Sequence, residues 1–177
     1  MSPAAGPLAG PVVTWMFAAG GRGASDGSLH VRDRATFRTV NAEANKALVR
    51  RFFAEVWSKG RTELAKEMVA DGYVSHNKLE IEVMGPAGIQ RAVTEQRSAF
   101  PDLETTIEDL IAEADKVVVR ATDRGTFTGA FMGMTPTGNR FTVTWIDIFR
   151  IEDGKLREAW LEIDTADFRR QLQARSE

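Results

Sequence analysis

The residues best suited to chemistry lie in one hairpin near the C-terminal end of the chain. Asp147 is the single charged residue in an otherwise apolar row of alternate residues, and Glu162 lies beyond the Asp153-Gly154 turn. A carboxylate in an apolar pocket loses hydration, so its pKa rises and it can act as a general base or acid near neutral pH. Of two neighbouring carboxyls, one tends to stay ionised while the other keeps its proton. The hairpin therefore predicts a carboxylate pair that moves a proton on a bound substrate.

The turn sets the pairing of the two strands on which this prediction rests. An Asp-Gly dipeptide between alternating apolar residues is typical of a two-residue hairpin loop, which fixes the register of both strands. With an unbroken register, Asp147 lies opposite Trp160 and Trp145 lies opposite Glu162, so that the two acids are diagonal neighbours on one face. We expect this face to be concave, with Trp145, Trp160 and Phe149 shaping its wall. The alternative is that the acids pair with arginines or reach solvent.

Further candidate residues lie outside the hairpin. His76 is the only histidine of the expected domain, and it suits a proton carrier or a hydrogen-bond donor to a substrate carbonyl. Asn77 beside it is a polar candidate for substrate binding, although a lone histidine is often a structural residue. The long loop 129–139 carries Phe131 and Met134 among glycines, so it forms either a pocket rim or a cover for the end of the sheet.

Composition excludes several other kinds of chemistry. The 177 residues include no cysteine and two distant histidines, so we expect neither a thiolate nucleophile nor a histidine-rich metal site. No glycine-rich motif for a nucleotide cofactor occurs in the sequence. With 23 Lys+Arg against 25 Asp+Glu, the chain has no electrostatic footprint for nucleic acid. No apolar run reaches the roughly 20 residues of a membrane-spanning helix. The expected partner is a small-molecule substrate.

The chain divides near residue 40. Gly, Pro, Ala and Ser dominate the first 28 residues, so we expect 1–40 to be a disordered or extension segment and 41–174 to be one domain. The apolar stretch 11–19 resembles the core of a signal peptide, but the first basic residue is Arg22, which follows it. We therefore expect a cytoplasmic protein.

Helical spacing comes first in this domain and strand spacing follows. Apolar residues three and four apart predict a helix from Asn41, as its cap, to Gly60, then a shorter helix from Thr62 and a third helix from Gly85 to Pro101. Residues 73–76 read as a short extended piece, and a final helix covers 165–174. Alternating and β-branched residues predict strands over 103–112, 116–128, 140–151 and 155–164. This order indicates an α+β fold, in which helices cover one face of a curved antiparallel sheet.

Several separate motifs resemble one known family. These are 44–57 (ANKALVRRFFAEVW), 73–76 (YVSH), 99–103 (AFPDL), 129–138 (GAFMGMTPTG) and 148–155 (IFRIEDGK). Together they resemble the SnoaL-like polyketide cyclase, or ester cyclase, family of the NTF2-like superfamily, over roughly Asn41 to Leu172. The resemblance implies a conical α+β barrel, whose curved antiparallel sheet packs on the N-terminal helices around an enclosed pocket, and usually a homodimer.

The resemblance also implies a reaction. In the polyketide cyclases of this family, an acid on the last strand acts as general base on the carbon next to a carbonyl, and intramolecular aldol ring closure follows without metal or cofactor. The corresponding position falls at or next to Glu162, and a pocket histidine of the cyclases corresponds to Asp147. The chain is thus expected to be a cofactor-independent enzyme acting on a polyketide-like or other apolar oxygenated molecule. Glu162 would be the base, Asp147 its acid or orienting partner, and His76 a carbonyl donor.

Two alternatives remain open at this point. The same scaffold resembles limonene-epoxide-hydrolase-like enzymes, in which carboxylates activate water and protonate an epoxide, and related proteins that form ether rings. A protein of this fold can also be a non-catalytic module that binds small molecules or dimerises.

Overall fold

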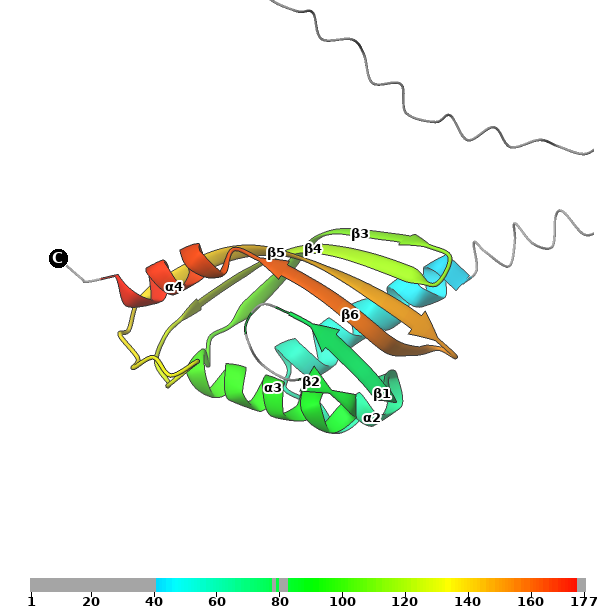
Figure 1. Cartoon of the computed structure of the whole chain (residues 1–177), viewed down its shortest axis with the longest axis horizontal. Helices are drawn as coiled ribbons and strands as arrows, with labels where there is room; N and C mark the ends of the chain where they lie inside the picture. Colours follow the sequence, from blue (N-terminus) through cyan, green and yellow to red (C-terminus); the bar gives the residue numbers. More distant parts are fainter. Residues whose placement is uncertain (1–40, 78, 80–82, 175–177) are drawn as a thin grey trace, which may run out of the picture.

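A computed structural model describes residues 41–77, 79 and 83–174 (Figure 1). The predicted extension 1–40 lies outside the described residues. Residues 41–51 are α-helical and continue into η1 (Phe52–Ser58), η2 (Thr62–Leu64) and α2 (Ala65–Met68). The chain continues with the elements β1 (Val69–His76), β2 (Val83–Met84), α3 (Gly85–Ala99), β3 (Glu104–Glu113), β4 (Lys116–Thr126), β5 (Arg140–Glu152), β6 (Lys155–Ile163) and α4 (Thr165–Gln173).

The strands form one six-stranded sheet in the order β2-β1-β6-β5-β4-β3. Figure 1 shows this sheet curving over the helices at residues 41–58 and α3. The predicted α+β fold with a curved sheet on the N-terminal helices is therefore confirmed. One detail differs, because β1 runs parallel to β6 while the other pairs are antiparallel. One helix and four strands separate β1 from β6 in the chain, so no hairpin forces these two strands to be antiparallel.

The helix boundaries follow most of the local signals. The first helix ends before Gly60, whose φ of 68° suits a glycine beyond a helix C-terminus. The third helix begins at Gly85 with proline in its first turn, as predicted. Asn41 is itself helical and so is not the cap. The second helix ends at Met68, because Val69 already begins β1, where pairing with β6 outweighs local helix propensity.

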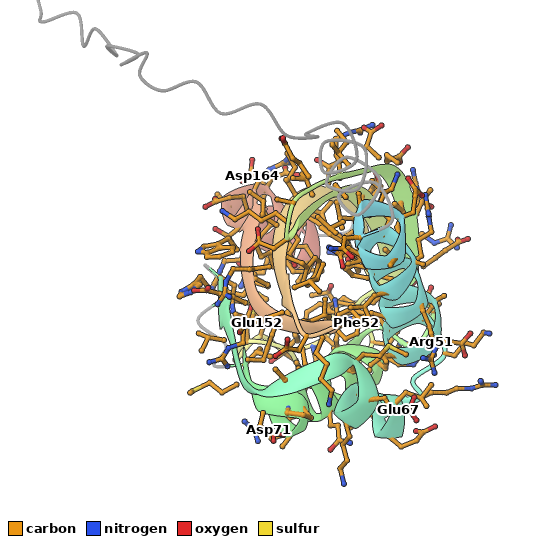
Figure 2. All side chains as sticks on the ribbon, turned by 90° about the vertical axis from the view of Figure 1, so that its right-hand side faces the viewer. Arg51, Phe52, Glu67, Asp71, Glu152 and Asp164 are labelled. Atoms are coloured by element: carbon orange, nitrogen blue, oxygen red, sulfur yellow. The ribbon has the colours of Figure 1, made fainter. Side chains whose placement is uncertain are left out.

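The first helix changes its geometry where it faces the sheet. Residues 52–58 form a π-helix rather than the expected α-helix, and the neighbouring rings of Phe52 and Phe53 are both buried. Each of them meets Phe149 of β5, at ring-centroid distances of 6.1 and 5.8 Å. Figure 2 shows Phe52 between helix and sheet, whereas Arg51 lies on the outside, where it pairs with Glu67 at 3.1 Å. Such π-turns often mark functional sites.

Two apolar clusters build the core. The larger one lies between the first helix, α3 and the sheet, and includes Phe52, Phe149 and Leu156. The smaller one joins the end of α3 to the loop after β4 and to α4; its buried members are Ala99, Phe100, Phe127, Phe131, Met134, Phe141, Val143, Phe168 and Leu172. The prediction that α4 packs through Phe168 and Leu172 is thus confirmed. Within the described residues, no helix is long and apolar enough to cross a membrane.

Phe100 is the centre of the smaller cluster and provides a test of the fold. Its fully buried ring meets those of Phe127, Phe131, Phe141 and Phe168 at 4.9–6.1 Å. We expect Phe100→Ala to lower the free energy of unfolding by about 3–5 kcal/mol, because it removes a large buried side chain and leaves a cavity. Urea unfolding measures this. The exposed Met84 is the control, and Met84→Ala is expected to change the free energy of unfolding by less than about 0.5 kcal/mol. Similar losses of stability in both variants would contradict the placement of Phe100 at the centre of the smaller cluster.

Candidate active site

The hairpin keeps the predicted register for only two pairs beyond its turn. Glu152 pairs with Lys155 and Ile151 with Leu156, but the next pair is Arg150 with Glu158. Arg157 is therefore an extra residue, a β-bulge in β6. Because side chains alternate with period two, one extra residue moves every later side chain of β6 to the other face. The register predicted beyond Leu156 is wrong for this reason.

The surroundings of Arg157 explain the bulge. Its guanidinium lies over Gly72 of β1, where a Cβ atom would overlap it. Its Nε also pairs with an oxygen of Glu152 at 3.2 Å. The pairing between β1 and β6 is irregular in the same region, between Val69 and Val74. The bulge thus depends on contacts with a strand that lies about 80 residues earlier in the chain.

The bulge separates the two acids that were expected to form a pair. Asp147 lies opposite Leu161, whereas the exposed Glu162 lies opposite Ile146 on the outer face. Leu161 and Ile163 are the residues of β6 that line the pocket. Trp160 also faces outward rather than forming the pocket wall. It stacks on His76 at 5.6 Å, and the Lys116 ammonium group lies 5.6 Å from its ring centre.

His76 belongs to this outer network. Its Nε2 lies 3.0 Å from Glu158 Oε1, while Arg150 pairs with the other oxygen of Glu158 at 3.0 Å. The hydrogen bond with His76, followed by that with Arg150, holds the pKa of Glu158 below its usual range. The His76 side chain is 50% exposed and is not among the residues that line the pocket. The structure therefore does not bring His76 together with Asp147.

A mostly apolar pocket is lined by residues of both core clusters. The space open to the centre of a water molecule is about 130 Å³. Of the predicted site residues, Asp147, Trp145, Phe149, Phe131 and Asn77 line it. Met134 is buried in the smaller cluster beside it. The other lining residues are Phe52, Phe53, Trp57, Tyr73, Ser75, Leu79, Val83, Ile89, Ala92, Gln96, Thr105, Asp123, Phe141, Val143, Leu161, Ile163 and Phe168.

Asp147 is the dominant charged group of this pocket. Only 9% of its surface is exposed, and this burial raises its pKa to about 7, although the backbone N–H groups of Ile148 and Trp160 act in the opposite direction. Its Oδ1 has no hydrogen-bond partner among the described residues. A buried carboxylate oxygen without a partner is costly and typical of a functional group. Asp147 can therefore accept a proton from a bound molecule near neutral pH.

Tyr73 on β1 lies close enough to Asp147 to be affected by its charge. Burial, followed by the Asp147 carboxylate, raises the pKa of the Tyr73 hydroxyl well above its ordinary value, while a hydrogen bond with Ser75 opposes this. The hydroxyl thus keeps its proton throughout the physiological range. Tyr73 lines the same pocket, so it supplies a neutral hydrogen-bond donor near the carboxylate.

Asp123 is a pocket residue that the sequence analysis missed. It lies on β4 opposite Val143 and is 9% exposed. Thr105 Oγ1 donates a 2.7 Å hydrogen bond to its Oδ1. Burial raises the pKa of Asp123, and the Thr105 hydroxyl and the Trp145 indole lower it. The signal was present in the sequence, because Asp123 continues the inward alternation of Val119 and Ala121, as Asp147 does on β5.

Comparison with known proteins identifies the family. Residues 47–172 match the family model described as SnoaL-like polyketide cyclase. The chain belongs to this family. Within the part of the chain that the structure describes, no group of three or more His, Cys, Asp or Glu side chains is arranged to hold a metal ion.

Two curated SnoaL-like relatives are each 35% identical to this chain over 115 residues, or 63% of its length. They are the aklanonic acid methyl ester cyclases DauD from Streptomyces sp. (strain C5), covered over 70% of its length, and DnrD from Streptomyces peucetius, covered over 78%. Among solved structures, TsrD from Streptomyces laurentii is 33% identical with a TM-score of 0.67, over 75% of this chain and 97% of that one. These matches confirm the predicted family and fold, and they agree with a cyclase-type enzyme.

The raised pKa of Asp147 predicts a pH-dependent stability. An aspartate that titrates near 7 when folded and near 3.9 when unfolded binds more protons in the folded state, so it destabilises the protein progressively as pH rises from about 4 to 7. Asp147→Asn removes this effect. The free energy of unfolding of the Asp147→Asn variant minus that of the wild type should therefore increase by a few kcal/mol between pH 4 and 7. A tenfold change in proton affinity is worth about 1.4 kcal/mol.

Urea unfolding of both proteins at several pH values between 4 and 8 measures this difference. Burial also raises the pKa of Asp123, but Asp123 is present in both proteins, so its contribution cancels in the difference. Glu162→Gln is the matched control, since it neutralises an exposed carboxylate on the outer face. A stability difference between Asp147→Asn and wild type that does not change with pH would contradict the placement of Asp147.

Proposed function

We propose that this protein is a cofactor-independent cyclase that closes a ring within a polyketide-like small molecule, with Asp147 as its general acid/base. One observation carries the proposal: Asp147 is buried in an apolar pocket, has a pKa of about 7, and keeps one oxygen without a partner. Two relatives are named as aklanonic acid methyl ester cyclases, which supports a substrate of similar chemistry.

The proposed reaction uses Asp147 twice. The ionised carboxylate takes a proton from the carbon next to a substrate carbonyl, and the resulting enolate attacks a second carbonyl of the same molecule to form the new carbon–carbon bond. The alkoxide produced by this attack then receives the proton from Asp147. No atom is gained or lost, so the reaction is an isomerisation. A pKa near the working pH suits both the removal and the return of the proton.

The surrounding residues support these steps in two ways. The Tyr73 hydroxyl, which keeps its proton, is placed to donate a hydrogen bond to the oxygen on which the enolate charge develops. The apolar walls, including Phe53 and Leu161, exclude water, which strengthens that interaction. They also hold a flexible chain in a folded shape, which brings the two reacting carbons together.

The base is thus proposed on β5 rather than on the last strand. The family resemblance implied an acid on the last strand, but the inward residues there are Ala159, Leu161 and Ile163, and Glu162 faces outward. Asp147, on the neighbouring strand directly opposite Leu161, is the carboxylate that reaches the same part of the pocket.

Epoxide opening fits this pocket less well. That reaction needs one group to activate water and another to protonate the oxygen of the same three-membered ring. Among the described residues, two acids line the pocket, Asp147 and Asp123. Asp123 lies opposite Val143, four residues from Asp147 along β5, which is about 13 Å at 3.3 Å per residue. A backbone separation of this size is larger than expected for two acids that act together on one small ring, which favours the cyclase.

We also propose a homodimer in the cytoplasm. The pairing of β3 to β6 places Ile111, Val118, Ile148 and Trp160 in one row across the outer face of the sheet. Ile111 is 64% exposed, and Ile146 beside the row is 44% exposed. Contiguous exposed apolar side chains of this kind favour association with another protein surface. Light scattering is expected to give a dimer for the wild type and a monomer for Ile111→Glu; a wild-type monomer would contradict the proposal.

Replacing Asp147 tests the proposed chemistry. With aklanonic acid methyl ester as the substrate, Asp147→Asn should lower kcat by about 10²–10⁴-fold, because the amide cannot take up the proton, while KM changes little. Product formation is followed by liquid chromatography, and circular dichroism verifies that each variant is folded. Glu162→Gln is the control and should keep nearly full activity. Ligand binding without turnover by the wild type would instead support a binding module.

A further inference from the structure

Asp123 is a buried acid that the proposed reaction does not use. It lines the pocket, is 9% exposed and is fixed by the 2.7 Å hydrogen bond from Thr105. Among the residues that the structure describes, the groups that oppose the effect of burial on its pKa are Thr105 and Trp145, and neither is basic. Burying a carboxyl group without a cationic partner costs free energy, and a fold keeps such a group where it serves a function.

A second polar group lies at the same place. The Trp145 indole Nε1 is buried, and within the described residues it makes no hydrogen bond of acceptable geometry. It is near enough to Asp123 for a weak hydrogen bond from the indole N–H to lower the pKa of that carboxyl. The two groups together offer an acceptor and a donor to one further polar atom. A hydroxyl oxygen satisfies both, since it donates to the carboxyl and accepts from the indole.

The spacing along β5 relates this place to the reacting end of the pocket. Val143, Trp145 and Asp147 point to the same face, and Asp123 pairs with Val143. The Cα atoms of Asp123 and Asp147 are therefore about 14 Å apart, from four residues along a strand and one step between strands. Trp145 lies between Val143 and Asp147 in this inward row of β5, and its ring centroid is 5.3 Å from that of Phe53. Two acids thus line the pocket at separate places along the sheet, with an aromatic residue between them in the row.

We propose that Asp123 is a specificity-determining residue that binds a hydroxyl group at the end of the substrate remote from Asp147. The substrate accordingly carries a hydroxyl group at the end remote from its reacting carbons. This inference rests on the proposed function, since Asp147 defines the reacting end. Thr105 is a positioning residue that orients the carboxyl group, and Trp145 supplies the second hydrogen bond.

Two flat three-ring probes test this recognition without any turnover. Dissociation constants of 2-hydroxyanthraquinone and of unsubstituted anthraquinone are measured by quenching of tryptophan fluorescence. The wild type should bind the hydroxylated probe about 5- to 30-fold more tightly, the range expected for a buried hydrogen bond to a carboxyl group. Asp123→Leu should abolish this preference and leave the affinity for anthraquinone within about twofold.

Conservative variants separate recognition from folding. Asp123→Asn keeps an acceptor oxygen and should retain most of the preference, whereas Thr105→Val should reduce it without abolishing it. Asp123→Leu should also raise KM for aklanonic acid methyl ester while kcat stays within about threefold. Circular dichroism and thermal unfolding verify that each variant is folded. An unchanged preference in Asp123→Leu would overturn the inference, as would a wild type that binds both probes equally or neither.

The same measurements distinguish failure of this inference from failure of the proposed function. Asp147→Asn should keep the preference for the hydroxylated probe, because the recognition lies at the other end of the pocket. If Asp147→Asn loses turnover but the wild type shows no preference, the role of Asp123 is wrong and the cyclase stands. If the preference depends on Asp123 but Asp147→Asn keeps full turnover, the proposed base is wrong and the binding site stands.

Discussion

The extra residue at Arg157 decides which side chains of the last strand enter the pocket. Without it, Glu162 would lie diagonal to Asp147 on the concave face, and of two neighbouring carboxyls one would tend to keep its proton while the other stays ionised. With it, the inward residue opposite Asp147 is Leu161. The pKa of Asp147 is then raised mainly by burial rather than by a second charge. Its protonation therefore depends on how dry the pocket is, and a substrate that fills the pocket raises the pKa of this carboxyl further.

The bulge also determines which side chains of β6 lie on the outer face of the sheet. Trp160, which an unbroken register would turn inward, instead stacks on His76 among charged groups, with Glu158 joining His76 to Arg150. Polar and ionisable groups thus gather where water reaches them, while the pocket retains few. This division has a chemical consequence, because each hydrogen bond made inside the pocket is strengthened by the low dielectric, and each polar group left there without a partner favours ligand binding.

Local alternation in the sequence was enough to place most of the fold and part of the site. The inward positions of Trp145, Asp147 and Phe149 follow from the period of a single strand, and the family motifs gave the architecture around them. The predicted register of β6 was wrong beyond Leu156, because it depends on a distant contact. The Arg157 bulge forms against Gly72, and no local pattern in the sequence predicts it. This bulge explains why Trp160 and Glu162 were predicted on the wrong face of the sheet. The position of His76 relative to the pocket could not be predicted, because the sequence carried no spatial information about it. Asp123 is different, because the alternation that identified Asp147 applies equally to β4 and was not used there.

The distance between Asp123 and Asp147 fits the proposed chemistry better than a close pair would. Aldol ring closure consumes no net proton, so one carboxyl that removes a proton from carbon and returns it to oxygen completes the reaction alone. A second acid within hydrogen-bonding reach would couple to the first, and neither would then titrate independently. Placed about four residues away along the sheet, Asp123 leaves the protonation of Asp147 undisturbed and is free to bind the substrate. In the proposed reaction, the pocket thereby separates the proposed base from the proposed hydroxyl-binding group, so a substrate must be long enough to reach both of them.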